Sequence, residues 1–222
     1  MADNATEPLL DPTLLVRVKL KAHQIDRKYA LRPETLPDEA ILPSLSAELA
    51  GEPKFAQVRM AIGINALFFQ LDVQGKKQLP WCRESRLEDS DGLHVWIDTR
   101  NSRDIHRATK YCYRLGFFAM GRGPKADLPF AGWAPINRAR DNSQPPPDDL
   151  MVVRAAIQPD RYRVVASVHF EALAGFDRQD FPTLGFYYGV QDRELGWQSL
   201  ALQPTFPVAE DPSLWGQLQI TG

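Results

Sequence analysis

The sequence predicts an all-β protein, an antiparallel β-sandwich of the jelly-roll or immunoglobulin-like kind, with about nine to eleven strands and little helix. Short segments in which apolar and polar residues alternate run through most of the chain. Turn-forming residues separate most of these segments, as they do in sandwiches and barrels. No strand, glycine-rich loop and helix follow one another in the way that a Rossmann fold or a P-loop requires.

The strands are predicted from this alternation, element by element. In residues 14–21, Leu14, Val16 and Val18 share one face while basic residues occupy the other, which indicates a half-buried strand. Residues 55–62 and 67–73 form a hairpin around a turn that begins at Gly63. Short helical turns are predicted at 44–50, 104–110 and 170–174. The remaining predicted strands are 93–97, 111–118, 151–157, 162–170, 184–191, 198–203 and 215–220.

Two segments show no strand pattern. Residues 22–53 carry four prolines and are expected to wrap over the surface or to cover a sheet edge, without forming strands. Residues 119–149 contain several glycines and prolines and are expected to form a long loop, which in a compact domain is functional or disordered. With these two segments included, residues 1–222 are predicted to form a single domain.

Charge and composition exclude several classes of protein. The 26 basic and 28 acidic residues give a net charge of −2, so we expect no nucleic-acid or membrane partner. Residues 1–15 lack the pattern of a secretory signal, and no apolar stretch reaches the roughly 20 residues that span a bilayer. Together with only two cysteines, this predicts a cytoplasmic protein that is a monomer or a weak homodimer.

Five stretches resemble a known family in their order along the chain. They are the 55–73 hairpin, residues 89–98, 116–123 and 161–173, and a C-terminal stretch with residues 185–192, Trp197 and 212–218. In this order the chain resembles the family 9 carbohydrate-binding module and the wider DOMON-like sandwich group. His94 stands where that family has a glutamate. The resemblance implies a β-sandwich that binds a saccharide without catalysing a reaction.

Trp81 is the first candidate for the ligand site. It lies in residues 78–86, a segment between predicted strands that also contains Arg83. A flat aromatic ring can stack on the C–H groups of a sugar, while neighbouring polar groups bind the hydroxyls. The alternative is that Trp81 plugs one end of the sandwich, and the sequence supports both interpretations equally.

Further candidates are spread over the chain. Trp133 and Trp197 are additional aromatic candidates, although core packing is the stronger interpretation for Trp197. Arg100 and the pair Asp192 and Arg193 are candidates to hydrogen-bond sugar hydroxyls. The predicted ligand-binding residues are thus Trp81, Arg83, Arg100, His106, Trp133, Asp192, Arg193 and Trp197.

Residues 98–107 form the most polar constellation. Asp98, Asn101 and Asp104 have the oxygen ligands that calcium prefers, and the family resemblance implies a structural calcium ion, but three flanking arginines oppose a cation site. Those arginines could instead bind an anion. We favour a third interpretation, a strand-end turn in which the aspartates accept hydrogen bonds from nearby backbone amides, and we expect no cofactor.

Metal binding and catalysis find little support. Cys82, His94, His106 and Cys112 lack the spacing of a zinc site, and a Cys82–Cys112 disulfide is disfavoured by the predicted compartment. No motif for a nucleophilic triad is present. We therefore predict a non-catalytic domain, and the family resemblance implies that it binds a saccharide. The alternative is an interaction or scaffold protein without a sugar ligand, and a hydrolase ranks third because it would need two carboxylates in a cleft.

Overall fold

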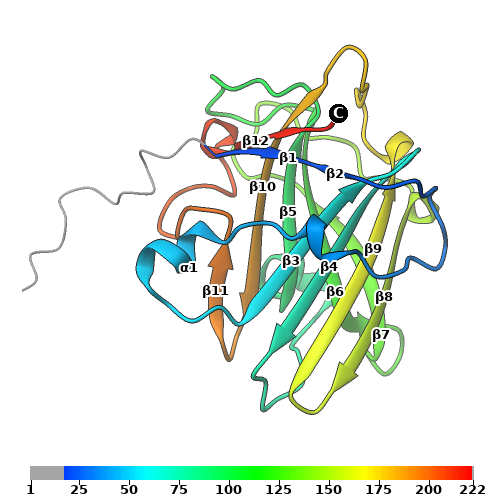
Figure 1. Cartoon of the computed structure of the whole chain (residues 1–222), viewed down its shortest axis with the longest axis vertical. Helices are drawn as coiled ribbons and strands as arrows, with labels where there is room; N and C mark the ends of the chain where they lie inside the picture. Colours follow the sequence, from blue (N-terminus) through cyan, green and yellow to red (C-terminus); the bar gives the residue numbers. More distant parts are fainter. Residues whose placement is uncertain (1–17, 222) are drawn as a thin grey trace, which may run out of the picture.

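The computed structural model describes residues 18–221, which form two β-sheets packed face to face (Figure 1). Sheet A contains seven strands in the order β1-β12-β10-β5-β6-β7, with β11 also paired to β10. Sheet B contains five strands in the order β2-β3-β4-β9-β8. In Figure 1 the strands of sheet B lie in front of β5, β6 and β10. The predicted all-β sandwich is confirmed.

The strands are β1 (Lys19–Lys21), β2 (His23–Gln24), β3 (Ala56–Ile62), β4 (Ala66–Gln74), β5 (Gly92–Asp98), β6 (Cys112–Arg122), β7 (Leu128–Ala134), β8 (Met151–Gln158), β9 (Arg161–His169), β10 (Thr183–Asp192), β11 (Gly196–Ser199) and β12 (Gly216–Gln219). The one α-helix of the described residues is α1 (Leu45–Ala50). Short 3₁₀ turns are η2 (Asp38–Ala40), η3 (Glu84–Asp89), η4 (Asp148–Leu150), η5 (Phe170–Ala172) and η6 (Pro212–Leu214).

The core lies between the two sheets and follows the predicted alternation. From β4, Leu71 and Val73 point inward and are fully buried, while Asp72 and Gln74 on the other face reach solvent. The β3–β4 hairpin pairs in register from Ala56 with Val73 to Ile62 with Leu67, as predicted. Most neighbouring strands are antiparallel, but β1 pairs with β12 and β2 with β3 in parallel.

The prediction of a long loop over residues 119–149 is wrong for its first half, whereas residues 135–147 contain no helix or strand. Strand β6 continues to Arg122, and β7 occupies Leu128–Ala134, so the glycines around position 123 mark a hairpin turn. Gly121 and Gly123 have φ values of +118° and +84°, which favour glycine. Pro129 is tolerated inside β7 because β7 is the edge strand of sheet A.

The N-terminal third also differs in part from the prediction. Residues 22–53 were expected to be free of strands, but they contain β2, which pairs with the edge of β3. The helix predicted at 44–50 is present as α1, which lies beside β11 (Figure 1). Of the strand predicted at 14–21, residues 14–17 lie outside the described part and β1 covers the end.

Two smaller elements change position or type. Residues 104–110 form turns and bends rather than the predicted helical turn. The strand predicted at 198–203 is β11, which begins at Gly196 and ends at Ser199 because the chain then turns away from β10.

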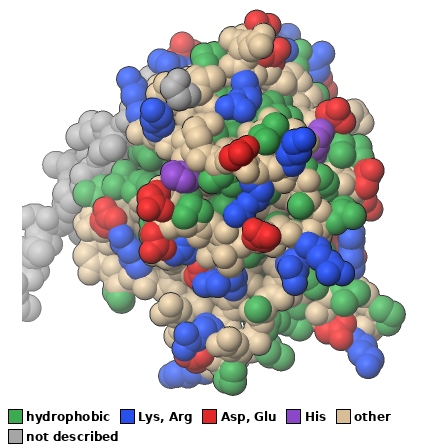
Figure 2. All heavy atoms as spheres, turned by 45° about the vertical axis from the view of Figure 1, so that its right-hand side comes forward, with side chains coloured by type: hydrophobic (Ala, Val, Ile, Leu, Met, Phe, Trp, Pro, Cys, Tyr) green, Lys and Arg blue, Asp and Glu red, His purple; other side chains and the backbone are tan. Residues whose placement is uncertain are grey.

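The surface reflects the balanced composition. Acidic and basic side chains are interspersed over the face shown in Figure 2, in keeping with the net charge of −2. Within residues 18–221, no helix is long and apolar enough to cross a membrane.

Candidate functional site

Trp81 lies in the connection between β4 and β5, as the sequence predicts, and its side chain is partly exposed. The guanidinium carbon of Arg193 lies over the indole ring, 3.3 Å from its centroid. The corresponding distances are 5.3 Å for Arg83 and 5.9 Å for Arg86. The structure thus gathers three arginines around one tryptophan, which we call the Trp81 cluster.

A buried carboxylate holds this cluster together. Asp91, immediately before β5, accepts a hydrogen bond from the backbone N–H of Trp81 at 2.8 Å and from that of Arg193 at 2.9 Å. The loop after β4 and the loop after β10 are therefore fixed to the same side chain. Because Asp91 is only 1% exposed, the two loops cannot exchange this contact for water without opening the structure.

Lys76 supplies the positive charge in the same network. Its ammonium group lies 2.8 Å from Asp192 Oδ1, 3.3 Å from Glu194 Oε2 and 3.7 Å from Asp91 Oδ2. Asp192 also accepts hydrogen bonds from the backbone N–H groups of Glu194 and Leu195. These bonds shape the turn between β10 and β11. The side chains of Lys76 and Asp192 are 3% and 0% exposed, so this is an internal ion network.

In this network, burial shifts the pKa of each charged group in one direction, and its ion pairs or hydrogen bonds shift the pKa in the other. Burial alone would lower the pKa of Lys76, but its contacts with the carboxylates, Asp192 above all, leave it raised. Burial raises the pKa of Asp91, although the hydrogen bonds that it accepts from two backbone amides oppose the shift. The network therefore keeps Lys76 charged at neutral pH.

Both cysteines are free and buried. Burial raises the pKa of Cys82 and of Cys112 to about 12, so neither thiol ionises near neutral pH. Cys82 follows Trp81 and donates to the backbone oxygen of Asp91 at 3.1 Å, so it helps to fix the loop.

Arg100 and His106 lie elsewhere, on the 98–107 segment. The guanidinium of Arg100 is 3.9 Å from the ring centroid of Phe181 and 4.8 Å from that of Tyr111. His106 is exposed, with its Nδ1 at 3.1 Å from both Asp211 and Ser213, and it lines a second hollow of about 480 Å³. No hydrogen bond, ion pair or stacking contact in residues 18–221 links either residue to the Trp81 cluster.

Trp133 and Trp197 are both partly buried. Trp133 lies on β7 opposite Leu115, packs against the core and donates its indole N–H to Ser143 at 3.0 Å. Trp197 lies on β11 with its ring over Gly189. Of the eight predicted residues, the structure brings together Trp81, Arg83, Asp192 and Arg193, and Asp192 among them is buried beneath the cluster.

The 98–107 segment forms the predicted strand-end turn. Asp98 accepts hydrogen bonds from the backbone N–H groups of Arg100 and Ser102 at 2.9 and 2.6 Å. Burial raises its pKa while these amides oppose the shift. Among the described side chains, no group of three or more His, Cys, Asp and Glu residues is arranged to hold a metal ion.

Sequence reasoning missed the residues that position the cluster. Lys76, Asp91 and Glu194 do not differ locally from other charged residues in turns, and only the fold places them together. A signal was available for Arg86, which lies three residues after Arg83 in the same loop. The hollow beside the cluster measures about 680 Å³ and is lined by Trp81, Arg83 and Met120, among others.

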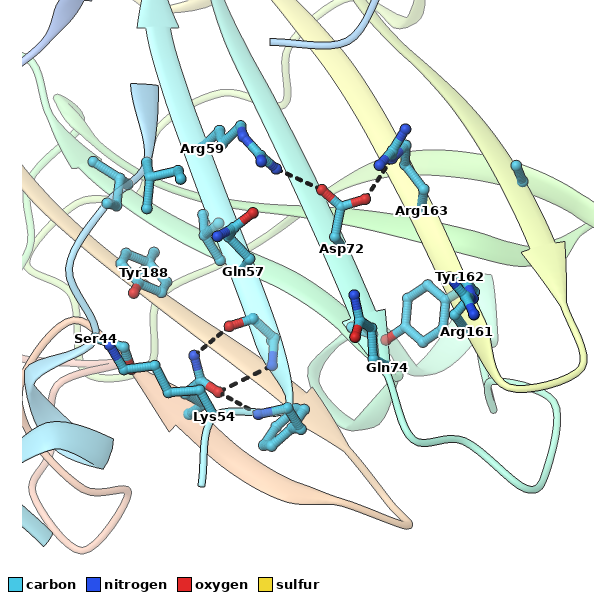
Figure 3. A pocket seen from close by; sticks show the side chains of 18 of the residues that line it. Ser44, Lys54, Gln57, Arg59, Asp72, Gln74, Arg161, Tyr162, Arg163 and Tyr188 are labelled. Atoms are coloured by element: carbon cyan, nitrogen blue, oxygen red, sulfur yellow. Dashed lines mark hydrogen bonds and ion pairs between the residues drawn. The ribbon is translucent and has the colours of Figure 1, made fainter. Parts of the chain in front are cut away.

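A further hollow lies on the outer face of sheet B and contains none of the predicted ligand residues. It measures about 610 Å³ and is lined by polar side chains of β3, β4, β8 and β9, together with apolar residues such as Ile41 and Phe55 and with Tyr188 and Gln198 of sheet A (Figure 3). Within it, Asp72 lies between Arg59 and Arg163 and accepts a hydrogen bond from each.

Comparisons with known proteins support the fold. The sequence matches no protein-family model and no curated protein. Among solved structures, it is similar to a carbohydrate-binding module of family 9 from Caldicellulosiruptor kristjanssonii in complex with cellotriose. The TM-score is 0.61 and the identity 14%, over 92% of this chain and 94% of that one.

Two more structures give the same result. One is a family 9 module from the same organism in complex with glucose, with a TM-score of 0.57 and 14% identity over 92% of this chain and 96% of that one. Another is a structure from Bacteroides uniformis, with a TM-score of 0.56 and 11% identity over 92% and 99% of the two chains. The DOMON-like part of the resemblance stays a prediction. The chain has a fold like that of the family 9 carbohydrate-binding modules.

Proposed function

We propose that this chain is a non-catalytic saccharide-binding domain whose ligand binds at the Trp81 cluster. The observation that carries the proposal is the partly exposed indole of Trp81 with three guanidinium groups around it. The fold supports it, because similar structures are family 9 modules in complex with cellotriose and with glucose.

The chemistry of the cluster suits a sugar. An indole offers an apolar face for the C–H groups of a pyranose ring, and guanidinium N–H groups donate to hydroxyl oxygens. Arg193 covers one face of the ring, so the ligand uses the surface that faces the adjoining hollow, where Arg83 and Met120 lie. Lys76 and Asp91 hold both loops in place, which limits the entropy lost on binding.

The buried network also argues for binding without catalysis. Asp91 and Asp192 approach the same lysine, and the pKa of Asp91 is raised, as a hydrolase would require of one carboxylate. Their side chains are 1% and 0% exposed, however, and a substrate has no access to them. Their role is therefore to position the loops.

A calorimetric titration with glucose and with cellotriose tests the proposal, together with a glycan array that covers other sugars. We expect Trp81→Ala to weaken binding of the best ligand at least about tenfold, or about 1.4 kcal/mol, because the stacking surface is lost. Leu79→Ala is the matched control, since Leu79 is 66% exposed in the same loop and lies outside the hollow.

The outcomes separate the two functions that the sequence leaves open. Equal effects of Trp81→Ala and Leu79→Ala on sugar affinity would reject the Trp81 cluster as the site. If the array shows no sugar ligand at all, the saccharide-binding function is wrong and the interaction or scaffold protein becomes the better interpretation.

A further inference from the structure

The outer face of sheet B presents two rows of side chains that cross the strands. Cross-strand pairing aligns Gln57, Asp72, Arg163 and Ala156 in one row. The next row contains Gln74, Arg161 and Gln158. Since neighbouring strands lie about 4.8 Å apart, the first row extends over about 14 Å across β3, β4, β9 and β8. A ligand along it would be longer than one sugar ring.

A polar outer face is common in antiparallel sheets with one side in water, but this face is also hollow. Ile41, Leu42, Ser44 and Lys54 also line the hollow, and its volume is about 610 Å³, within the range of ligand sites. Ile41 is held in place by an antiparallel backbone bridge to Arg59 of β3. We call this hollow the sheet B groove.

The charges in the groove are largely neutralised by pairs within the protein. Arg59 bonds Asp38 and Asp72 at 2.7 Å each, and Arg163 pairs with Asp72. Lys54 pairs with Glu48 at 2.5 Å and Arg161 with Asp160 at 2.9 Å. Each of the four basic side chains therefore has an acidic partner, and the four bases and four acids together carry no net charge, although only Asp72 among the acids lines the groove itself.

Hydrogen-bonding groups, by contrast, remain available. Gln57, Gln74 and Gln158 are exposed, and within residues 18–221 their side chains make no hydrogen bond. Arg163 donates a hydrogen bond to Asp72 through its Nε alone, so its two terminal nitrogens are available to a ligand. Each amide offers a donor and an acceptor, which matches a hydroxyl group that also does both. Of the aromatic residues of the lining, Tyr162 and Tyr188 are buried, and Phe55 is partly buried and packs against the core.

We propose that the sheet B groove is a second binding site, for the interior of an extended neutral oligosaccharide. Its amide and guanidinium groups bind hydroxyls along the chain without aromatic stacking. The site lies on a different surface from the Trp81 cluster and depends on different side chains. It can therefore be tested apart from the proposed function.

The test uses the full chain carrying Trp81→Ala, which removes the ring of the other site. Cellohexaose, xylohexaose and mannohexaose are titrated calorimetrically at low and high NaCl, with glucose and hexagalacturonic acid alongside. We expect at least one neutral hexamer to bind in a salt-independent way and glucose not to bind. Adding Gln57→Ala and Gln74→Ala should weaken that binding at least about tenfold.

The matched control is the pair Gln144→Ala and Gln179→Ala, which removes two exposed glutamines outside the groove. Thermal unfolding of both pairs confirms that the fold is kept. The proposal is overturned if none of the three neutral hexamers binds the Trp81→Ala chain, or if both glutamine pairs have the same effect. Tighter, salt-sensitive binding of hexagalacturonic acid would overturn the neutral assignment, because the groove would then recognise an anion.

Discussion

Asp91 connects the loop after β4 with the loop after β10, and Arg193 in the second loop lies 102 positions from Asp91 in the sequence. Its two oxygens accept different backbone N–H groups, one from Trp81 and one from Arg193, and its charge faces Lys76. A buried lysine is tolerated only when its charge is paired and its donors are bound. Asp91 therefore contributes both geometry and charge to the Trp81 cluster.

Replacing Asp91 with asparagine tests this role. The amide keeps one acceptor but turns an N–H₂ group toward the other backbone donor, and Lys76 loses one of three acidic neighbours. We expect Asp91→Asn to lower the free energy of unfolding by about 1–3 kcal/mol, measured by urea denaturation. Sugar affinity should fall as well, because the loops that carry Trp81 and Arg193 separate.

Asp160→Asn is the control for this change. Asp160 also pairs with a basic residue, Arg161, but both side chains are more than half exposed. Such a pair adds little to stability, so the urea midpoint should stay that of the wild type. An Asp91→Asn protein as stable as the Asp160→Asn protein would show that the two loops do not depend on Asp91.

The sequence could predict part of the candidate site at the level of single residues. Trp81 and Arg83 are neighbours in one loop, and Arg193 follows a recognisable strand, so each was a visible candidate. Lys76 could not be identified, because a buried lysine in a turn has the same local sequence as an exposed one. The sheet B groove was equally hidden, since alternation predicts a polar face but not that the face is hollow.

At the scale of elements, the packing of β11 against β10 depends on a glycine in β10. Trp197 lies on β11, and an added Cβ at Gly189 of β10 would approach the Trp197 Cη2 atom to 2.2 Å. This is far below any normal contact, and Trp197 packs against the core. The absence of a side chain at position 189 therefore determines where the ring lies.

A double-mutant cycle tests this packing. We expect Gly189→Ala to lower the free energy of unfolding by about 1–3 kcal/mol, because the methyl group displaces the indole. In a Trp197→Ala background the same substitution should cost much less, since the ring is gone. Equal costs in both backgrounds, measured by chemical denaturation, would show that the contact with Trp197 does not limit position 189.

Alternation of apolar and polar residues predicted strands with one solvated face, and strands buried on both faces, such as β5, were also predicted. Strand β4 is an example of the first kind, because Leu71 and Val73 alternate with Asp72 and Gln74. Strand β7 was missed because its alternation is weak and Pro129 normally argues against a strand. The β2 strand could not be predicted from its two residues, since it depends on the exposed edge of β3.

At the scale of the whole molecule, one buried histidine links stability to pH. His94 lies on β5 with its ring fully enclosed, and its Nε2 is 3.0 Å from the backbone oxygen of Ser90. Burial, and then the charge of Arg114, lowers the pKa of His94 to about 4 in the folded protein. The unfolded chain has the ordinary value of about 6.5. Between these two values, only the unfolded chain binds the proton.

The stabilisation that neutral His94 allows is therefore fully present above about pH 6.5 and is lost as the pH falls toward 4. We expect the free energy of unfolding to fall by about 2 kcal/mol between pH 7 and pH 5, measured by urea denaturation. Burial raises the pKa of Asp91 and Asp98, and these groups act in the opposite sense because the folded state takes up their protons first. His94→Gln keeps a donor for Ser90 but cannot titrate. Its stability should change much less over this range, and equal losses in both proteins would mean that another group controls the pH dependence.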